Sequence, residues 1–491
     1  MADYGASSAC TRRGAVSVLC VLVSGCVSLA PAPVTPPLPV AADWPADAPH
    51  DPDANVHAPE LPWERYFVEP SLQQLIQSAL RNNRDLRIAV LRVEEARAAY
   101  RISRADAWPT LAVGMQASRA RVPGDLNLTG HSLVSGDDEA YVGISSWELD
   151  LWGRVRDLKS GALETYLATD AARAAVRVSL IAQVADGYLG LRELDERVAL
   201  ARRTEESRAE AFRIFTRRHD VGAISKLELT EVQTLLTQAQ ALRTQLEQAR
   251  AIQAHALGRL VGDGTDALTA SGHFDDAAIF GELQVGLPSR LLVDRPDIMA
   301  SEHQLRAADF SIGAARAAFF PRIALTATWG TASAELDGLF DAGSRAWTFV
   351  PTFSLPIFDG GRRRANLDVT RVRREIAVAD YERTVQNAFR EVADALAARQ
   401  WLDRQVRFQR MTVDTQIERA RLAQLRYDSG AAPYLEVLDA QRALLAAEQE
   451  WVQARRALLS SRVALYAALG GGAGVDVAPS YSSTPATAQS R

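Results

Sequence analysis

Cysteine is almost absent from this 491-residue chain, and its three cysteines all lie within the first 26 residues. Removal of a leader containing Cys10 and Cys20 would leave Cys26 as the single thiol, which excludes a framework of disulfide bonds. The chain also lacks any run of about 18 apolar residues, so we expect no transmembrane helix. The net charge is −5 and no basic patch stands out, which argues against nucleic acid as a partner.

Signatures of catalysis and metal binding are missing as well. The sequence contains none of the patterns GxxxxGK[ST], HExxH or GxSxG, and its seven histidines are scattered along the chain. Isolated histidines are more often surface or structural groups than metal ligands. We therefore predict no catalytic residues, no metal site and no cofactor, and we expect that the protein is not an enzyme.

The first 25 residues are typical of a leader, because Arg12 and Arg13 precede a short apolar stretch at 14–25. That stretch ends in VSGC, which looks like a bacterial lipobox. We predict cleavage before Cys26 and acylation of Cys26, with palmitate-type chains that anchor by burying methylenes at about 0.8 kcal/mol each. An ordinary signal peptide with a chance cysteine is the alternative. Residues 26–69 are predicted to be an acylated tether, and 471–491 a disordered tail.

Between these ends the chain repeats itself. The stretch RHDVGAISKLELTEVQ at 218–233 returns 208 residues later as RYDSGAAPYLEVLDAQ at 426–441. Further identical pairs at this offset include Val184 and Val392, Asp186 and Asp394, and Leu257 and Leu465. Matches in one order, including both glycine turns, are not expected by chance in Ala- and Leu-rich helices. We predict two repeats, 70–262 and 287–470, joined by a linker at 263–286.

Each repeat has the same predicted plan. A first helix, at 72–107 or 290–318, ends before a proline, because proline removes a donor and disfavours helix in the preceding residue. A hairpin follows, at 109–152 or 321–358. Long helices come last, and they are predicted at 155–215, 226–260, 363–425 and 435–469. A helix of 60 residues is about 90 Å long, which favours lateral packing of helices over a single globular core.

The hairpins show the alternation of apolar with small or polar residues that is typical of strands. We expect one apolar face, which in the second strand would carry Tyr141, Trp147, Leu149 and Leu151. Four strands of about ten residues would suit a tilted membrane span. The aromatic residues Tyr141, Trp152, Trp329 and Trp347 would suit interfacial girdles. Water-soluble hairpins on a helical body are the alternative, and Pro351 in mid-strand counts against a fully paired ladder.

Four strands are too few for a membrane barrel, which needs at least about eight and must close because lipid cannot satisfy a free sheet edge. If the strands span a membrane, several copies must share one barrel. Three copies would give about twelve strands.

In these features the chain resembles the TolC-type outer-membrane factors, in particular the lipoprotein branch that serves RND-type multidrug efflux pumps. The resemblance covers about 61–470. Its carriers are the duplicated plan, the twin turns, NNRDL at 82–86 against DRPDI at 294–298, and ELDLWGRVR at 148–156 against LPIFDGGRRR at 355–364.

The resemblance implies a mixed α and β membrane protein. Its fold would be a homotrimer with a shared twelve-stranded transmembrane β-barrel, four strands per chain, and a long-helix α-barrel in the periplasm. It implies location in the bacterial outer membrane, with a lipid anchor at Cys26, and docking to a periplasmic membrane-fusion adaptor and an inner-membrane RND-type pump. The implied function is passive exit of drugs or other small molecules. A duct for type I protein secretion would share this fold. A lipid-tethered periplasmic coiled-coil scaffold is a rival from another class, although it has no reason to carry four amphipathic strands.

The twin turns are predicted to be helix-hairpin tips, at 219–225 and 427–433. Gly222 and Gly430 can adopt the positive φ that ends a helix. By resemblance, the tips contact the adaptor and form the gate, with Asp220, Tyr427 and Asp428 beside the glycines. We expect Arg217, Arg218 and Arg426, with Asp220 and Tyr427, to hold the tips together. Ala432 stands where relatives often carry a basic residue, so some of the family's closing ion pairs would be absent.

Two acidic residues follow the second tip. Glu436 and Asp439 are three apart and so share a helix face. By resemblance they match the family's paired carboxylates at the periplasmic constriction, and Glu228 is the counterpart on the first tip. Acidic rings would favour cations and repel one another. The alternative is that acidic residues in a first helical turn only complement the helix dipole.

Overall fold

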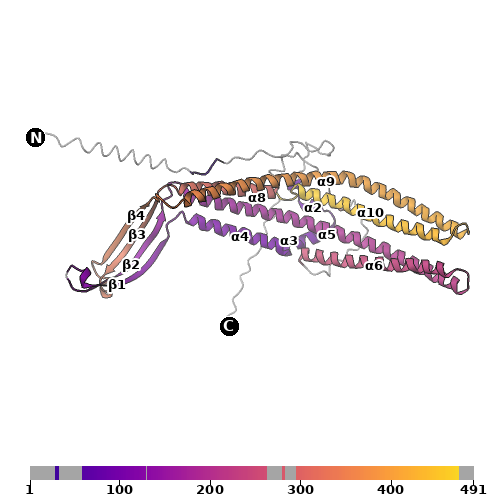
Figure 1. Ribbon diagram of the computed structural model, residues 1–491, viewed down its shortest axis with the longest axis horizontal. Coiled ribbons are helices and arrows are strands. Elements are labelled where there is room, and N and C mark those ends of the chain that lie inside the picture. Colours follow the sequence, from indigo (N-terminus) through magenta and orange to yellow (C-terminus); the bar gives the residue numbers. More distant parts are fainter. Residues whose placement is uncertain are drawn as a thin grey trace. The chain divides into compact units, whose positions relative to one another are not determined.

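The computed structural model describes residues 28–32, 58–128, 130–262, 279–281, 283 and 295–474. The described part is mostly helical and contains one four-stranded sheet (Figure 1). The chain divides into two compact units. The first unit comprises 1–37, 92–169 and 300–382, and the second comprises 38–91, 170–299 and 383–491.

The sheet belongs to the first unit and contains the four predicted strands. They are β1 (Leu111–Val122), β2 (Leu133–Glu148), β3 (Arg322–Ser333) and β4 (Arg345–Ser354). All pairings are antiparallel and the strand order is β1-β2-β3-β4, so β1 and β4 are the edges. Pro351 lies in edge strand β4 opposite Leu325. An edge strand is where a sheet tolerates proline, so this residue does not interrupt the ladder.

The register places the large apolar side chains on one face of the sheet. Val113 lies opposite Val142, which lies opposite Trp329, which in turn lies opposite Trp347. Directly opposed residues share a face. Trp329 and Trp347 are 67% and 73% exposed, so the described residues leave this part of the face uncovered. The same face also carries Leu111, Ile144, Trp147, Leu325, Phe349 and Phe353, whereas the other carries Gly114, Gln116, Tyr141, Thr328 and Thr348.

The predicted alternation in the second strand is wrong, because Tyr141 and Trp147 lie on opposite faces. The register shifts by one residue between Ile144 and Trp147, and Ser146 at this bulge has a left-handed φ of 51°. A bulge inserts one unpaired residue, and side chains beyond it therefore change faces. Tyr141 packs over Gly114, where a Cβ would lie 2.6 Å from the tyrosine Cζ.

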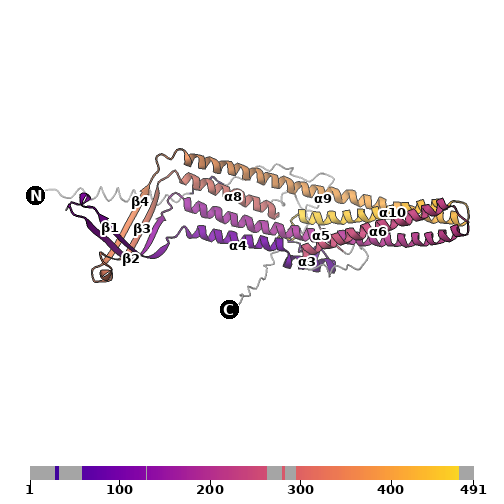
Figure 2. The same cartoon turned by 60° about the horizontal axis from the view of Figure 1, so that its bottom comes forward.

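The first three long helices are slightly longer than predicted, and the last has its predicted length, displaced by one residue. Helices α5 (Arg154–Asp220) and α9 (Arg362–Asp428) have 67 residues each, about 100 Å of helix. Helices α6 (Lys226–Val261) and α10 (Tyr434–Ala468) follow them. In the second unit α6 runs back along α5, and α10 runs back along α9 (Figures 1 and 2). None of the helices in the described ranges is long and apolar enough to span a membrane.

The first helix of repeat one is interrupted, contrary to the sequence prediction of one helix at 72–107. Helix α3 (Pro70–Asn82) ends and α4 (Arg84–Ala105) begins around Asn83, whose ψ of 130° is extended. The Asn83 side chain accepts a hydrogen bond from the Leu86 amide at 2.9 Å and donates one to the Leu260 carbonyl at 2.9 Å. Asn83 therefore serves as the N-cap of α4. The matching helix of repeat two is α8 (Pro296–Ala317), and the first part of its predicted range, 290–294, lies outside the described residues.

Residues 58–69 were predicted to belong to the tether, and this prediction is wrong. They form a short 3-10 helix, η1 (Ala58–Glu60), and α2 (Trp63–Tyr66) in the core of the second unit. The ring of Tyr66 stacks on that of Tyr466 with a centroid distance of 4.4 Å. The Gly472 amide donates to the Ala58 carbonyl at 2.9 Å, so the start of the predicted tail is also ordered. The aromatic residues of this segment, Trp63, Tyr66 and Phe67, provide the apolar area that is buried here.

Candidate functional site: the hairpin tips

The two predicted tips have the same backbone geometry. Gly222 and Gly430 have φ of 75° and 74°. Each tip has the same outer hydrogen bond, from the Ala223 amide to the Arg218 carbonyl and from the Ala431 amide to the Arg426 carbonyl, both at 2.8 Å. This is the Schellman ending of a helix. A Cβ on either glycine would meet nothing within 4 Å, so the positive φ, rather than crowding, is what favours glycine there.

Glu228 on the first tip is part of a helix cap. The Ser225 amide donates to the Glu228 carboxylate at 2.8 Å, and the Glu228 amide donates to the Ser225 hydroxyl at 3.2 Å. This is a capping box. The hydrogen bonds from the Ser225 amide and hydroxyl lower the pKa of Glu228. The structure therefore gives Glu228 a local role in stabilising the start of α6. This role is close to the alternative named above, in which an acidic residue in the first helical turn only complements the helix dipole.

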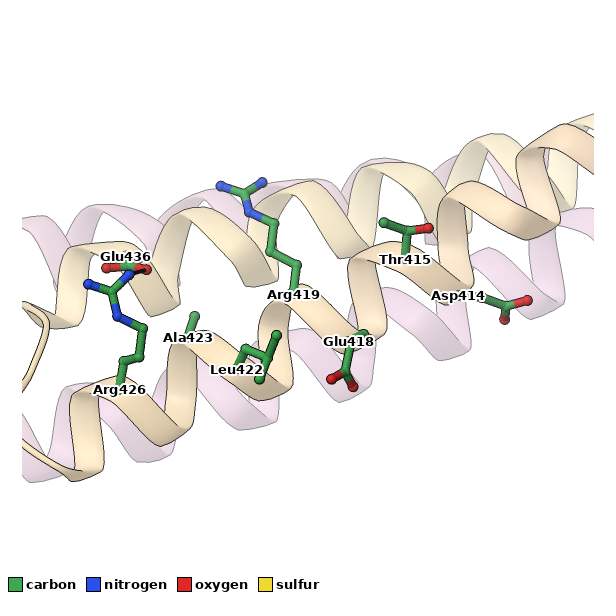
Figure 3. A pocket seen from close by; sticks show the side chains of 8 residues that line it. All are labelled: Asp414, Thr415, Glu418, Arg419, Leu422, Ala423, Arg426 and Glu436. Atoms are coloured by element: carbon green, nitrogen blue, oxygen red, sulfur yellow. Dashed lines mark hydrogen bonds and ion pairs between the residues drawn. The ribbon is translucent and has the colours of Figure 1, made fainter.

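Glu436 on the second tip is paired differently. Its carboxylate lies 2.6 Å from Nη1 of Arg426, which reaches it from α9 (Figure 3). At an offset of 208, the counterpart of Ser225 is Pro433, the N-cap of α10, which forms no side-chain cap. Glu436 therefore has no serine to bind and pairs with an arginine.

Asp439 lies between two arginines. Its carboxylate is 2.6 Å from Arg419 Nη2 and 2.8 Å from Arg442 Nη2. The hydrogen bond from Arg419 is the main cause that lowers the pKa of Asp439. With Arg426 beside Glu436, three cations face two carboxylates, so this tip is not an unpaired acidic cluster. The sequence analysis missed Arg419, because it is far from Asp439 in the chain. The pairing of Asp439 with Arg442 could have been predicted from their i,i+3 spacing.

A groove of about 730 Å³ runs along α9 beside the ion pair of Arg426 and Glu436 (Figure 3). The paired side chains Arg419, Arg426 and Glu436 are between 36% and 57% exposed. Hydrated charges of this kind can attract or repel passing ions. The groove is lined by Asp414, Thr415, Glu418, Arg419, Leu422, Ala423, Arg426 and Glu436.

An aromatic cluster connects the two tips. Arg218 on α5 donates a hydrogen bond to the Tyr427 hydroxyl on α9, as the sequence led us to expect. The ring of Tyr434 lies 4.5 Å from that of Phe215 and 4.9 Å from that of Tyr427, centroid to centroid. Burial among these groups raises the pKa of Tyr434. The sequence analysis did not identify Phe215 or Tyr434, because neither is matched by an aromatic residue in the other repeat.

The remaining predicted site residues make local contacts or lie outside the description. Asp220 is 3.9 Å from Nδ1 of the neighbouring His219, and Asp428 accepts a hydrogen bond from Gln424 at 2.8 Å. Cys26 lies outside the described residues. Within the described ranges, no group of three or more His, Cys, Asp or Glu side chains could hold a metal ion.

Comparison with known proteins gives consistent matches. The family model described as outer membrane efflux protein matches residues 75–263 and 287–471, in agreement with a tandem repeat. The probable efflux pump outer membrane protein TtgC of Pseudomonas putida is 41% identical over 459 residues, which are 93% of this chain and 95% of the relative. Outer membrane protein OprJ of Pseudomonas aeruginosa is 41% identical over 461 residues, which are 94% of this chain and 96% of OprJ. The open-state crystal structure of the MtrE outer membrane channel of Neisseria gonorrhoeae superimposes with a TM-score of 0.83 at 36% identity, covering 92% of this chain and 99% of MtrE.

Proposed function

This chain belongs to the outer membrane efflux protein family, and we propose that it is the exit channel of a tripartite efflux pump. In this role it is a homotrimer in the bacterial outer membrane. It passively conducts drugs or other small molecules from the periplasm to the exterior while docked to a membrane-fusion adaptor and an inner-membrane RND-type transporter. The names of the relatives TtgC and MtrE, an efflux pump protein and an outer membrane channel, support this proposal.

The observation that carries the proposal is the sheet. It has four strands with edges at β1 and β4, and one face bears exposed tryptophan, phenylalanine, leucine and valine side chains. Lipid can cover such a face, but it cannot satisfy the backbone groups of a free edge. Pairing β1 of one copy with β4 of the next removes both edges. Three copies then supply about twelve strands, within the range of membrane barrels.

Two measurements test this function. The mass of the protein in detergent, corrected for bound detergent, is expected to correspond to three chains, and a single chain would contradict the proposal. In cells that contain an adaptor and a pump but no exit channel, expression of this chain should lower the accumulation of a fluorescent pump substrate. Restored export of a secreted polypeptide without any effect on the small molecule would favour the secretion duct instead.

We also propose that Glu436 and Asp439, with Glu228 on the first tip, form the periplasmic gate. In a trimer, each of the first two residues would repeat three times around the axis. Their pairing with arginines reduces the mutual repulsion that two unpaired acidic rings would have. The glycine turns at Gly222 and Gly430, with the flanking residues Asp220, Tyr427 and Asp428, are proposed to contact the adaptor.

The lipid anchor remains a proposal, with Cys26 as the acylated first residue of the mature chain. The leader at 1–25 is removed in this proposal. The two repeats are assigned to 70–262 and 287–470, with the linker at 263–286. Intact mass of the purified protein tests the anchor, because acyl chains add a fixed mass that a Cys26→Ser variant lacks.

A further inference from the structure

A short N-terminal segment, residues 28–32, lies on the helices of the first unit, and we call it the strap (Figure 1). The Ser28 hydroxyl donates to Oδ1 of Asp157 at 2.6 Å. Nη1 of Arg316 donates to the Leu29 carbonyl at 2.9 Å. Asp157 lies in the first turn of α5 and Arg316 in the last turn of α8. The strap is therefore held by two helices from different repeats.

Two residues beneath the strap, Asp157 and Gly313, allow it to pack closely against the helices. Asp157 is only 1% exposed, and its Oδ2 has no hydrogen-bond partner within the described ranges. Burial raises the pKa of Asp157, whereas hydrogen bonding from Ser28 and Leu29 of the strap opposes that rise. Gly313 of α8 allows the close approach, because a Cβ there would lie 2.1 Å from Asp157 Oδ2 and 2.7 Å from the Ala30 nitrogen.

The position of this site along the chain suggests its use. Helix α5 begins at Arg154, shortly after β2 ends at Glu148, and α8 ends at Ala317, shortly before β3 begins at Arg322. Asp157 and Arg316 therefore lie close to the junctions between the sheet and the helices. Cys26 precedes Ser28 by two residues, which span about 7 Å at most.

We propose that Asp157, with Gly313 and Arg316, positions the acyl anchor by holding the strap near the helix-side end of the sheet's apolar face. This inference rests on the proposed acylation of Cys26. At that end the apolar face begins with Trp147, Ile323 and Phe353, on which acyl chains in the same leaflet can pack. A free tether would let the chains move away from the sheet, whereas the strap keeps their effective concentration beside it high.

The first experiment tests whether the site holds the strap. Hydrogen–deuterium exchange is measured on residues 28–32 in the full-length protein in detergent. Gly313→Ala is expected to raise deuterium uptake of the strap to the level of a free peptide. Gly161→Ala is the matched control, because its Cβ would meet the nearest atom of α8 at an ordinary 3.5 Å, and it should leave uptake unchanged. Ser28→Ala removes one donor without altering either helix and should raise uptake partially. Unchanged uptake in both Gly313→Ala and Ser28→Ala would overturn the proposal.

The second experiment tests positioning of the anchor. Intact mass first establishes acylation of Cys26, so failure of the lipid anchor is recognised separately from failure of the strap. Gly313→Ala is then compared in the acylated protein and in unacylated Cys26→Ser protein, both reconstituted in phosphatidylethanolamine–phosphatidylglycerol vesicles. The midpoint of thermal unfolding should fall by several degrees in the acylated protein only. An equal fall in both, or no fall in either, would show that the strap does not position the anchor.

Discussion

Arg218 and Tyr427 join the two hairpin tips of one chain. The guanidinium donates a hydrogen bond to the tyrosine hydroxyl, and its carbon lies 5.9 Å from the ring centroid. The repeat explains this pairing, since Arg218 is the counterpart of Arg426, which pairs with Glu436 inside its own hairpin. Arg218 has no such partner available, because Glu228 is engaged by Ser225. The difference between Ser225 and Pro433 therefore accounts for the two pairings. Arg218 contacts the other tip, whereas Arg426 forms an ion pair within its own tip.

Loss of the contact between tips should favour the open channel. Tyr427→Phe removes a hydrogen bond worth about 1 kcal/mol, which is a shift of about fivefold in an opening equilibrium. We expect a correspondingly higher open probability in single-channel recordings from planar bilayers. Asp428→Asn is the control, because Asp428 bonds only within its helix to Gln424 in the contacts described above. Equal increases in both variants would show that the bond between tips does not restrain opening.

Removal of Arg419 should increase the negative charge at the proposed gate. Arg419→Ala leaves Asp439 with Arg442 alone, and we expect a higher cation-to-anion permeability ratio from reversal potentials. The double variant Glu436→Ala with Asp439→Ala should lower that ratio. Arg213→Ala also removes a cation, but it is paired with Glu210 elsewhere on α5, and it should have a smaller effect. If Arg419→Ala raises the ratio no more than Arg213→Ala does, and the double variant leaves it unchanged, Glu436 and Asp439 do not line the constriction.

The permeability ratio should also depend on pH in a defined direction. Arg419 lowers the folded-state pKa of Asp439, so the carboxylate stays charged as pH falls through the ordinary carboxyl range. The stability that this pair contributes is present above the unfolded-state pKa and is lost as pH falls through the folded-state pKa. In Arg419→Ala, the titration of the permeability ratio should move to higher pH. A midpoint that stays in place would exclude Asp439 as the titrating group.

The capping box should control local opening of the first tip. Ser225→Ala removes an N-cap worth about 1 kcal/mol, so amides in the first turn of α6 should exchange about fivefold faster near neutral pH. The lowered pKa of Glu228 gives a second signature. In the parent protein, protection should fall as pH drops through the folded-state pKa, and Ser225→Ala should weaken this dependence. Thr230→Ala, which removes a hydroxyl bonded to the Lys226 carbonyl, tests whether any polar loss in α6 has the same effect.

The β-bulge should be dispensable for the orientation of Trp147. Deletion of Ser146 leaves a single residue opposite Thr326, so Trp147 stays opposite Leu325 on the apolar face. We therefore expect the deletion variant to form trimers in detergent and to insert into the outer membrane. Ser146→Gly should be tolerated or slightly stabilising, because glycine adopts a φ of 51° at little cost. Loss of trimers from the deletion variant would show that assembly needs the bulge itself.

The sequence predicted the helices, the four strands and the glycine turns because each has a periodic or local signal. The bulge at Ser146 escaped detection, since a single inserted residue leaves the apparent alternation of Tyr141 and Trp147 intact. The break at Asn83 was missed for a related reason, because asparagine is compatible with a helix and its capping bonds depend on Leu260 of another helix.

The site was only partly predictable. Glu436 and Asp439 were found from their spacing, but their electrostatic setting depends on Arg419 and Arg426, which the folded hairpin brings to them. Comparison of Ser225 with Pro433 in the aligned repeats could have separated the roles of Glu228 and Glu436. The strap at 28–32 was assigned to a tether, because its contacts with Asp157 and Arg316 involve distant parts of the chain.

The edge strands β1 and β4 have a consequence for the biogenesis of the protein. A newly exported chain would carry unpaired amide and carbonyl groups along both β1 and β4 before it meets its neighbours. The groups that close the tube in the membrane would also template aggregation in the periplasm. Strand folding, subunit association and insertion into the membrane are therefore expected to proceed as one coupled event.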